Sequence, residues 1–286
     1  MLSDRAMIAN LTIKTWAAKK YDDKITEDIT TNKGIRKSVI RATKVLLPND
    51  PQLKRIKQAR QDLRGYHYEH TLPWEWKTTQ LLPGEFFMEY TKTIATLISD
   101  FEREVDAFCD PVYYNNAIQA ASIELKDTFC HQDYPLPGQI RDHFTASIAY
   151  SPVPSAGDFR VDIQAEEIAD LKAAWTIKEG DITRKCTEHL WTKLHDMMEH
   201  AQERLSDPKN VFHDTLPANI KDFTDILSKM NIGEDFNLDA IGKEAATIGG
   251  LEPQDLRDDP GLRRAAANTS QPVLDKIKKQ MGAFNA

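Results

Sequence analysis

The sequence predicts a mainly α-helical fold with a small β-sheet (α+β), in which long amphipathic helices pack around a few strands and a C-terminal cluster of short helices follows. Apolar residues recur every three or four positions over much of the chain, which is typical of amphipathic helices. A few short stretches instead alternate between apolar and polar residues, as half-buried strands do. A chain of 286 residues is long enough for one large core or two smaller ones.

The predicted strands lie at the N-terminus and in the middle of the chain. Residues 7–16 alternate in polarity and are rich in β-formers, and residues 144–150 and 158–163 show similar patterns on either side of a proline-rich turn. A charged helix is expected over residues 17–31. A basic segment then runs to the proline break at residues 48–51.

Three long helices are predicted in addition. Residues 52–68 form a basic amphipathic helix, and residues 85–108 and 112–129 form two more. Between the first two, the prolines in residues 71–84 predict an aromatic loop. The clearest periodicity covers residues 165–205, where Gly180 leaves one long helix or two collinear helices open.

The C-terminal part reads as a series of short helices. Prolines near the first turn and glycines just past the end are typical of helix boundaries. They place helices at residues 217–230, 238–248, 260–267 and 272–281.

Charge is distributed unevenly along the chain. Residues 1–65 contain fifteen Lys/Arg and seven Asp/Glu, a net charge of +8, so the remainder carries −15 of the total of −7. A basic segment of this kind favours a nucleic-acid or other anionic partner, or an acidic protein surface. We therefore expect three regions: a basic α+β domain at 1–163, a long central helix or helix pair at 164–206, and an acidic helical region at 207–286.

The cellular compartment is predicted from what the sequence lacks. It contains no apolar run of membrane-spanning length and no basic and apolar signal at its start. Its three cysteines, Cys109, Cys130 and Cys186, form an odd and widely spaced set. Reduced thiols in the cytoplasm, with no membrane partner, are expected.

Two groups of residues raise the question of chemistry. His67, Glu69 and His70 can serve as general acid and base or bind a metal, but no catalytic motif accompanies them, and a packed aromatic corner is the simpler interpretation. Four further residues on one predicted helix have offsets that do not place them all on one face, namely Cys186, His189, His195 and His200. We therefore expect no metal and no cofactor, and the sequence favours a non-enzymatic protein while leaving open an enzyme centred on His67, Glu69 and His70.

The best functional signal is a basic helix followed by aromatic residues. Cations that neutralise phosphates beside aromatic rings that stack on bases are the combination used by single-strand binders. A solvated basic face with tryptophans in the core is the alternative. The candidate residues are Lys54, Arg55, Lys57, Arg60, Arg64, Tyr66, His67, Tyr68, Trp74 and Trp76.

Parts of the first half also carry a resemblance. Residues 7–16 with the following Lys20-Tyr21-Asp22, and residues 66–74 with the later Leu81-Leu82-Pro83, resemble a family of uncharacterised proteins encoded by tailed bacteriophages and related mobile elements. The resemblance implies a genomic setting among phage DNA replication and recombination functions, sometimes beside ring-forming ATPases. It supplies no catalytic residues.

These observations predict a non-enzymatic phage early protein that assists DNA replication or recombination in the host cytoplasm. It would bind single-stranded DNA as an oligomer. The alternative is an interaction factor that binds a host defence component or an ATPase through the apolar stripe at 168–205 or through the acidic C-terminal region. A structural component of the virion is a third reading.

Overall fold

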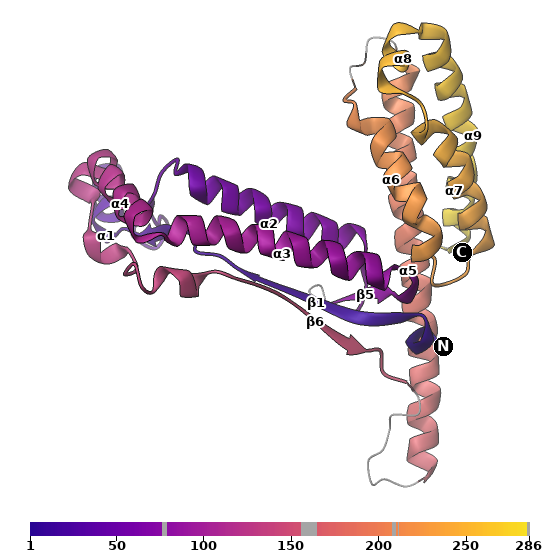
Figure 1. Ribbon diagram of the computed structural model, residues 1–286, viewed down its shortest axis with the longest axis horizontal. Coiled ribbons are helices and arrows are strands. Elements are labelled where there is room, and N and C mark those ends of the chain that lie inside the picture. Colours follow the sequence, from indigo (N-terminus) through magenta and orange to yellow (C-terminus); the bar gives the residue numbers. More distant parts are fainter. Residues whose placement is uncertain (76–78, 156–164, 208–209, 211, 285–286) are drawn as a thin grey trace. The chain divides into compact units, whose positions relative to one another are not determined.

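The computed structural model describes residues 1–75, 79–155, 165–207, 210 and 212–284 (Figure 1). Helices dominate the described residues and a four-stranded sheet accompanies them, which confirms the predicted mainly α fold with a small β-sheet. The chain forms two compact units, and each is built from segments that are distant in sequence. Unit 1 contains residues 1–10, 68–90 and 149–286, and unit 2 contains residues 11–67 and 91–148.

The four-stranded sheet has the strand order β4-β5-β1-β6. Its strands are β1 (Ala6–Lys14), β4 (Leu72–Pro73), β5 (Thr79–Pro83) and β6 (Thr145–Pro152). The strands predicted at 7–16 and 144–150 are thus confirmed, whereas the strand predicted at 158–163 lies outside the described residues.

The loop expected over residues 71–84 is wrong, because β4 and β5 form there. Ala6 of β1 pairs with Pro83 and Asn10 with Thr79, in an antiparallel register. Pro73 is tolerated because β4 is an edge strand of two residues, and Pro83 is tolerated because it is the last residue of β5. The prolines correctly predicted that no helix forms here, but they did not predict that the segments between them pair as strands.

A two-stranded ribbon and a short helix open unit 2. The helix expected from residue 17 is displaced, because β2 (Lys19–Tyr21) pairs with β3 (Thr43–Val45) and α1 (Asp23–Lys33) begins only afterwards. The Asp22 carboxylate caps α1 by accepting the Ile25 N–H at 3.0 Å. The helix ends at Gly34, whose φ of 64° is the left-handed conformation that glycine adopts without strain.

The remainder of unit 2 is helical. It contains most of α2 (Pro51–Glu69) and α3 (Phe87–Cys109) and all of α4 (Pro111–Leu125), as the sequence predicts. The Gln52 side chain donates to the main-chain carbonyl of Glu104 at 2.9 Å, which ties the start of α2 to the end of α3. Buried apolar residues hold these elements together, among them Leu46, Ile56, Leu63, Phe101, Val105, Phe108, Tyr114, Ile140 and Phe144.

In unit 1 a helical bundle surrounds one long helix. α5 (Ala165–Ser206) is continuous, so Gly180 does not divide it. Figure 1 shows α6 (Thr215–Met230), α7 (Phe236–Gly249) and α9 (Pro260–Phe284) gathered beside the C-terminal half of α5. Short turns complete the chain: α8 (Pro253–Asp258) and 3-10 segments at Leu2–Asp4, Gly84–Phe86, Lys126–Thr128, His131–Asp133 and Ile140–His143.

Two predicted helices at 260–267 and 272–281 are in fact one, because α9 continues through Pro272. A proline in a helix interior costs about 3 kcal/mol. Burial on both sides of it offsets this cost, since Ala267 before it and Val273, Leu274 and Ile277 after it are all buried.

Two close contacts hold the bundle together. Gly249 approaches α6 so closely that an added Cβ would lie 2.6 Å from the main-chain nitrogen of Lys221. The buried guanidinium of Arg263 donates to the carbonyls of Arg204 at 2.6 Å and of Asp207 and Asn210 at 2.7 Å. The Arg204 carbonyl lies in the last turn of α5, where the helix supplies no further N–H, and the Asp207 carbonyl also accepts the Asn210 N–H at 3.0 Å.

Candidate nucleic-acid interface

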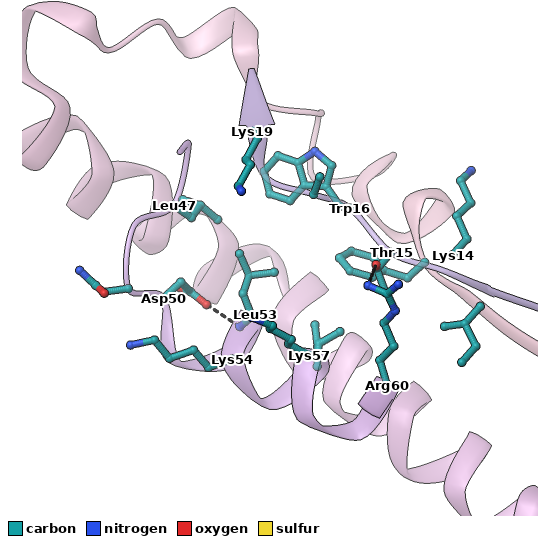
Figure 2. Close-up of a pocket in the computed structure, with 15 residues that line it drawn as sticks. Lys14, Thr15, Trp16, Lys19, Leu47, Asp50, Leu53, Lys54, Lys57 and Arg60 are labelled. Carbon is teal, nitrogen blue, oxygen red and sulfur yellow. Dashed lines mark hydrogen bonds between the residues drawn. The ribbon is translucent and has the colours of Figure 1, made fainter. Parts of the chain in front are cut away.

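A pocket of about 690 Å³ lies within unit 2, between the first half of α2 and the segment that leaves β1 (Figure 2). The apolar residues of its lining include Ile13, Leu47, Leu53 and Phe144. Trp16 lies among these residues, half-buried. A pocket of this volume is large enough for a ligand of drug or nucleotide size.

Five cationic side chains line the pocket. Lys54, Lys57 and Arg60 come from one face of α2, because residues three apart on a helix are neighbours. The buried side chains of Ile56 and Leu63 fix the rotation of this helix. Lys14 at the end of β1 and Lys19 at the start of β2 complete the set.

None of these five cations has a carboxylate within 4 Å among the residues that the structure describes. Arg60 instead lies 3.5 Å from the Thr15 hydroxyl, and Lys14 donates to the Asp142 carbonyl at 3.1 Å. Lys20 and Lys44, also in unit 2, are by contrast paired with carboxylates. Uncompensated charges around one hollow produce a positive potential that attracts anions.

Asp50, the one carboxylate that the described part of the chain contributes to the pocket lining, is already engaged. It accepts the Leu53 N–H at 2.8 Å as the cap of α2, and its other oxygen accepts the Tyr113 hydroxyl at 3.1 Å. Burial and the Asp50 charge raise the pKa of Tyr113. Asp50 therefore occupies the positive end of the helix, and an anion is left to the lysines and arginine along its side.

Beside the buried Phe144, Trp16 is the aromatic residue among the described pocket residues whose ring is only half-buried. Its ring centre lies 6.3 Å from that of Phe108 and 6.3 Å from that of Tyr114, the second contact being edge-on. These contacts hold the indole against the core while it still lines the pocket. A planar base can stack on a ring held in this way.

The pocket contains only part of the residue set that the sequence suggests. Lys54, Lys57 and Arg60 line it, whereas Arg55 and Arg64 are exposed on α2 outside the pocket lining. Lys14, Trp16 and Lys19 were missed. The available signal was weak: a tryptophan between lysines at the end of a predicted strand.

The predicted aromatic residues lie elsewhere. Tyr66 is half-buried, Tyr68 is 39% exposed, and Trp74 packs against the apolar core of unit 1. His67 is buried, and burial lowers its pKa to about 4, which keeps the ring neutral at physiological pH. Trp76 lies outside the described residues.

Cys186 and His70 are both engaged in packing. The buried Cys186 thiol lies 3.5 Å from the Pro73 carbonyl, and burial raises its pKa to about 12. The His70 ring stacks on Phe86 with ring centres 5.0 Å apart, and Glu69 is exposed. Among the described residues, no group of three or more His, Cys, Asp or Glu is placed to hold a metal ion.

No family model, curated protein or solved structure matches the chain. In the part of the chain that the structure describes, no helix is both long and apolar enough to cross a membrane.

Proposed function

We propose that this protein binds single-stranded nucleic acid through the basic pocket of unit 2. The observation that carries the proposal is the set of five cations without carboxylate partners around an indole ring, in the part of the chain that the structure describes. Salt-dependent neutralisation of phosphates by such cations supplies most of the affinity in non-specific nucleic-acid binding.

The charge of the two units supports this assignment. Unit 2 contains eighteen Lys/Arg and fifteen Asp/Glu, a net charge of +3, whereas unit 1 carries −10. A polyanion would therefore be repelled by unit 1 and attracted to the pocket in unit 2. Because these cations lie around the pocket, the attraction of a polyanion to unit 2 is strongest at the pocket.

The indole favours a single strand over a duplex. In a duplex the faces of the bases are already stacked on each other, whereas a single strand can place a base on Trp16. The apolar residues of the lining suit a base, and its cations suit the phosphates on either side of that base. Asp50, the only carboxylate among the described residues that line the pocket, is engaged, which favours binding over acid–base catalysis.

The biological setting follows from the resemblance to phage proteins. We propose that the protein acts as an oligomer in DNA replication or recombination of a phage or mobile element, in the cytoplasm of the host cell. The role in phage DNA metabolism, the oligomer and the host cytoplasm are proposed from the resemblance and from the charge of the N-terminal region, not from the pocket geometry.

The test is a salt titration of binding to labelled single-stranded and double-stranded oligonucleotides. We expect affinity for the single strand to exceed that for the duplex and to fall steeply with salt. Absence of salt-sensitive binding at physiological ionic strength would refute the proposal.

A second candidate function is suggested by the N-terminal half of α5. Figure 1 shows this half extending beyond the bundle of α6, α7 and α9, and it exposes Ile177 (69%) and Leu171 (39%). The predicted stripe from 168 to 205 is otherwise used internally, since residues such as Cys186, Leu194 and Leu205 are buried in unit 1. Binding of a protein partner through this half predicts a stoichiometric complex that Ile177→Asp abolishes; an unchanged complex would exclude this surface.

A further inference from the structure

The β2–β3 ribbon of unit 2 separates its cations by face. Lys20 pairs with Lys44 across the ribbon, whereas Lys19 pairs with Val45 and Tyr21 with Thr43. Because successive side chains on a strand point to opposite sides, Lys20 and Lys44 share one face and Lys19 and Tyr21 share the other.

The first face is an internal ion-pair network. Asp133 binds Lys20 and Lys44 at 2.7 Å each, and Lys44 also lies 3.3 Å from Asp22. Burial opposes the charge on Lys44, but its hydrogen bonds and ion pairs with Asp133 and Asp22 outweigh this and raise its pKa. These lysines are therefore committed to holding unit 2 together.

The second face continues from the pocket. Lys19 lines the pocket, and Tyr21, two residues along the same face, lies about 7 Å further on. The guanidinium of the exposed Arg41 lies 4.9 Å from the centre of the Tyr21 ring. An arginine over an aromatic ring offers both a charge for a phosphate and a flat surface for a base.

The loop that precedes β3 adds further cations. Arg36 and Lys37 are exposed there, after Lys33 at the end of α1, and Lys37 also pairs with Glu27 at 3.1 Å. Val39 in the same loop is 69% exposed. Asp22 and Asp133 bind Lys44 on the first face, and Tyr21 also borders the pocket that contains these two carboxylates, together with Asp23, Asp28 and Asp127.

We propose that the outer face of the ribbon, with Lys19, Tyr21 and Arg41, is a second subsite that binds the nucleotides of a single strand adjoining those in the pocket. This inference rests on the proposed function and extends it. The strand would pass from Trp16 along Lys19 to the Tyr21–Arg41 pair, so the binding site is longer than the pocket.

Oligonucleotide length tests the subsite. Binding of fluorescent oligothymidylates of about four and about sixteen nucleotides, lengths that bracket the sites of known single-strand binders, is measured at low salt. The variant Tyr21→Ala/Arg41→Ala should weaken binding of the long oligonucleotide about tenfold, as expected for loss of one stacked base. Binding of the short oligonucleotide should not change.

The matched control removes a charge from the same strand but from the first face. Lys20→Ala should leave both affinities unchanged, and Tyr21→Phe should retain the affinity of the native protein because the ring remains. Thermal unfolding followed by circular dichroism verifies that each variant is folded. A subsite variant that does not fold is replaced by Arg41→Gln, for which the same selective loss for the long oligonucleotide is expected.

The outcomes separate the two proposals. A pocket variant such as Lys57→Glu should weaken binding of both oligonucleotides. If it does, and the subsite variant weakens binding of both lengths equally or of neither, the second subsite is refuted. No effect of the pocket variant on either length would instead refute the proposed function.

Discussion

Removing the three cations that α2 contributes to the pocket is the most direct perturbation. Lys54→Ala/Lys57→Ala/Arg60→Ala leaves the buried residues of the helix, such as Ile56 and Leu63, in place. These cations have no carboxylate partners among the described residues, so their loss should cost little stability. A change in binding can then be attributed to the pocket.

The magnitude follows from counterion release. For single strands, each phosphate contact contributes about −0.7 to the slope of log K against log salt concentration. If all five pocket cations contact phosphates, the slope is about −3.5, and the triple variant should reduce it to about −1.4. The loss in affinity at roughly 0.15 M salt is then about fifty-fold.

The assay is fluorescence anisotropy with a labelled single-stranded oligonucleotide at several salt concentrations. The control makes the same change in net charge on unit 1, by replacing the exposed Lys185, Lys243 and Lys279 with alanine. If the control variant lowers the slope as much as the pocket variant, binding reports overall charge and the assignment of the pocket is wrong.

Three further predictions concern single residues. Trp16→Ala should weaken single-strand binding by about tenfold, measured by the same titration, and Trp16→Phe should restore part of it; equal affinities would show that no base stacks there. Arg263→Met should lower the free energy of unfolding by about 1–3 kcal/mol for each carbonyl left without a donor, measured by urea denaturation; a neutral result would contradict the capping role. His67 has a folded pKa of about 4, below its unfolded value, so the stability it contributes is present above about pH 6.5 and is lost as the pH falls through 4. Denaturation at several pH values should show a loss of about 3 kcal/mol that His67→Gln removes, and an identical pH profile for both proteins would contradict the burial argument.

Local patterns predicted most elements correctly. The alternation over residues 7–16 became β1, and the helical spacing of Leu53, Ile56 and Leu63 became α2. These signals lie within one element, so the sequence carries them directly. Where local propensity conflicted with packing, packing decided, as in the continuous α9 with Pro272 inside it.

The composition of the candidate site was determined only in part by the sequence. Charge and periodicity identified the basic face of α2, with Lys54, Lys57 and Arg60 on it. The sequence did not indicate that Trp16 belongs to the candidate site and Trp74 does not. That difference arises because Trp74 packs against the core of unit 1.

The sequence by itself determined a mainly helical protein with a basic N-terminal region and a basic amphipathic helix within it. The tertiary structure decided which cations are available to a ligand. Lys19 and Lys20 are neighbours in sequence, yet Lys20 binds Asp133, which lies far along the chain, and Lys19 lines the pocket. Strand geometry turns adjacent side chains to opposite faces, and only the contacts between distant segments determine which face carries the carboxylates.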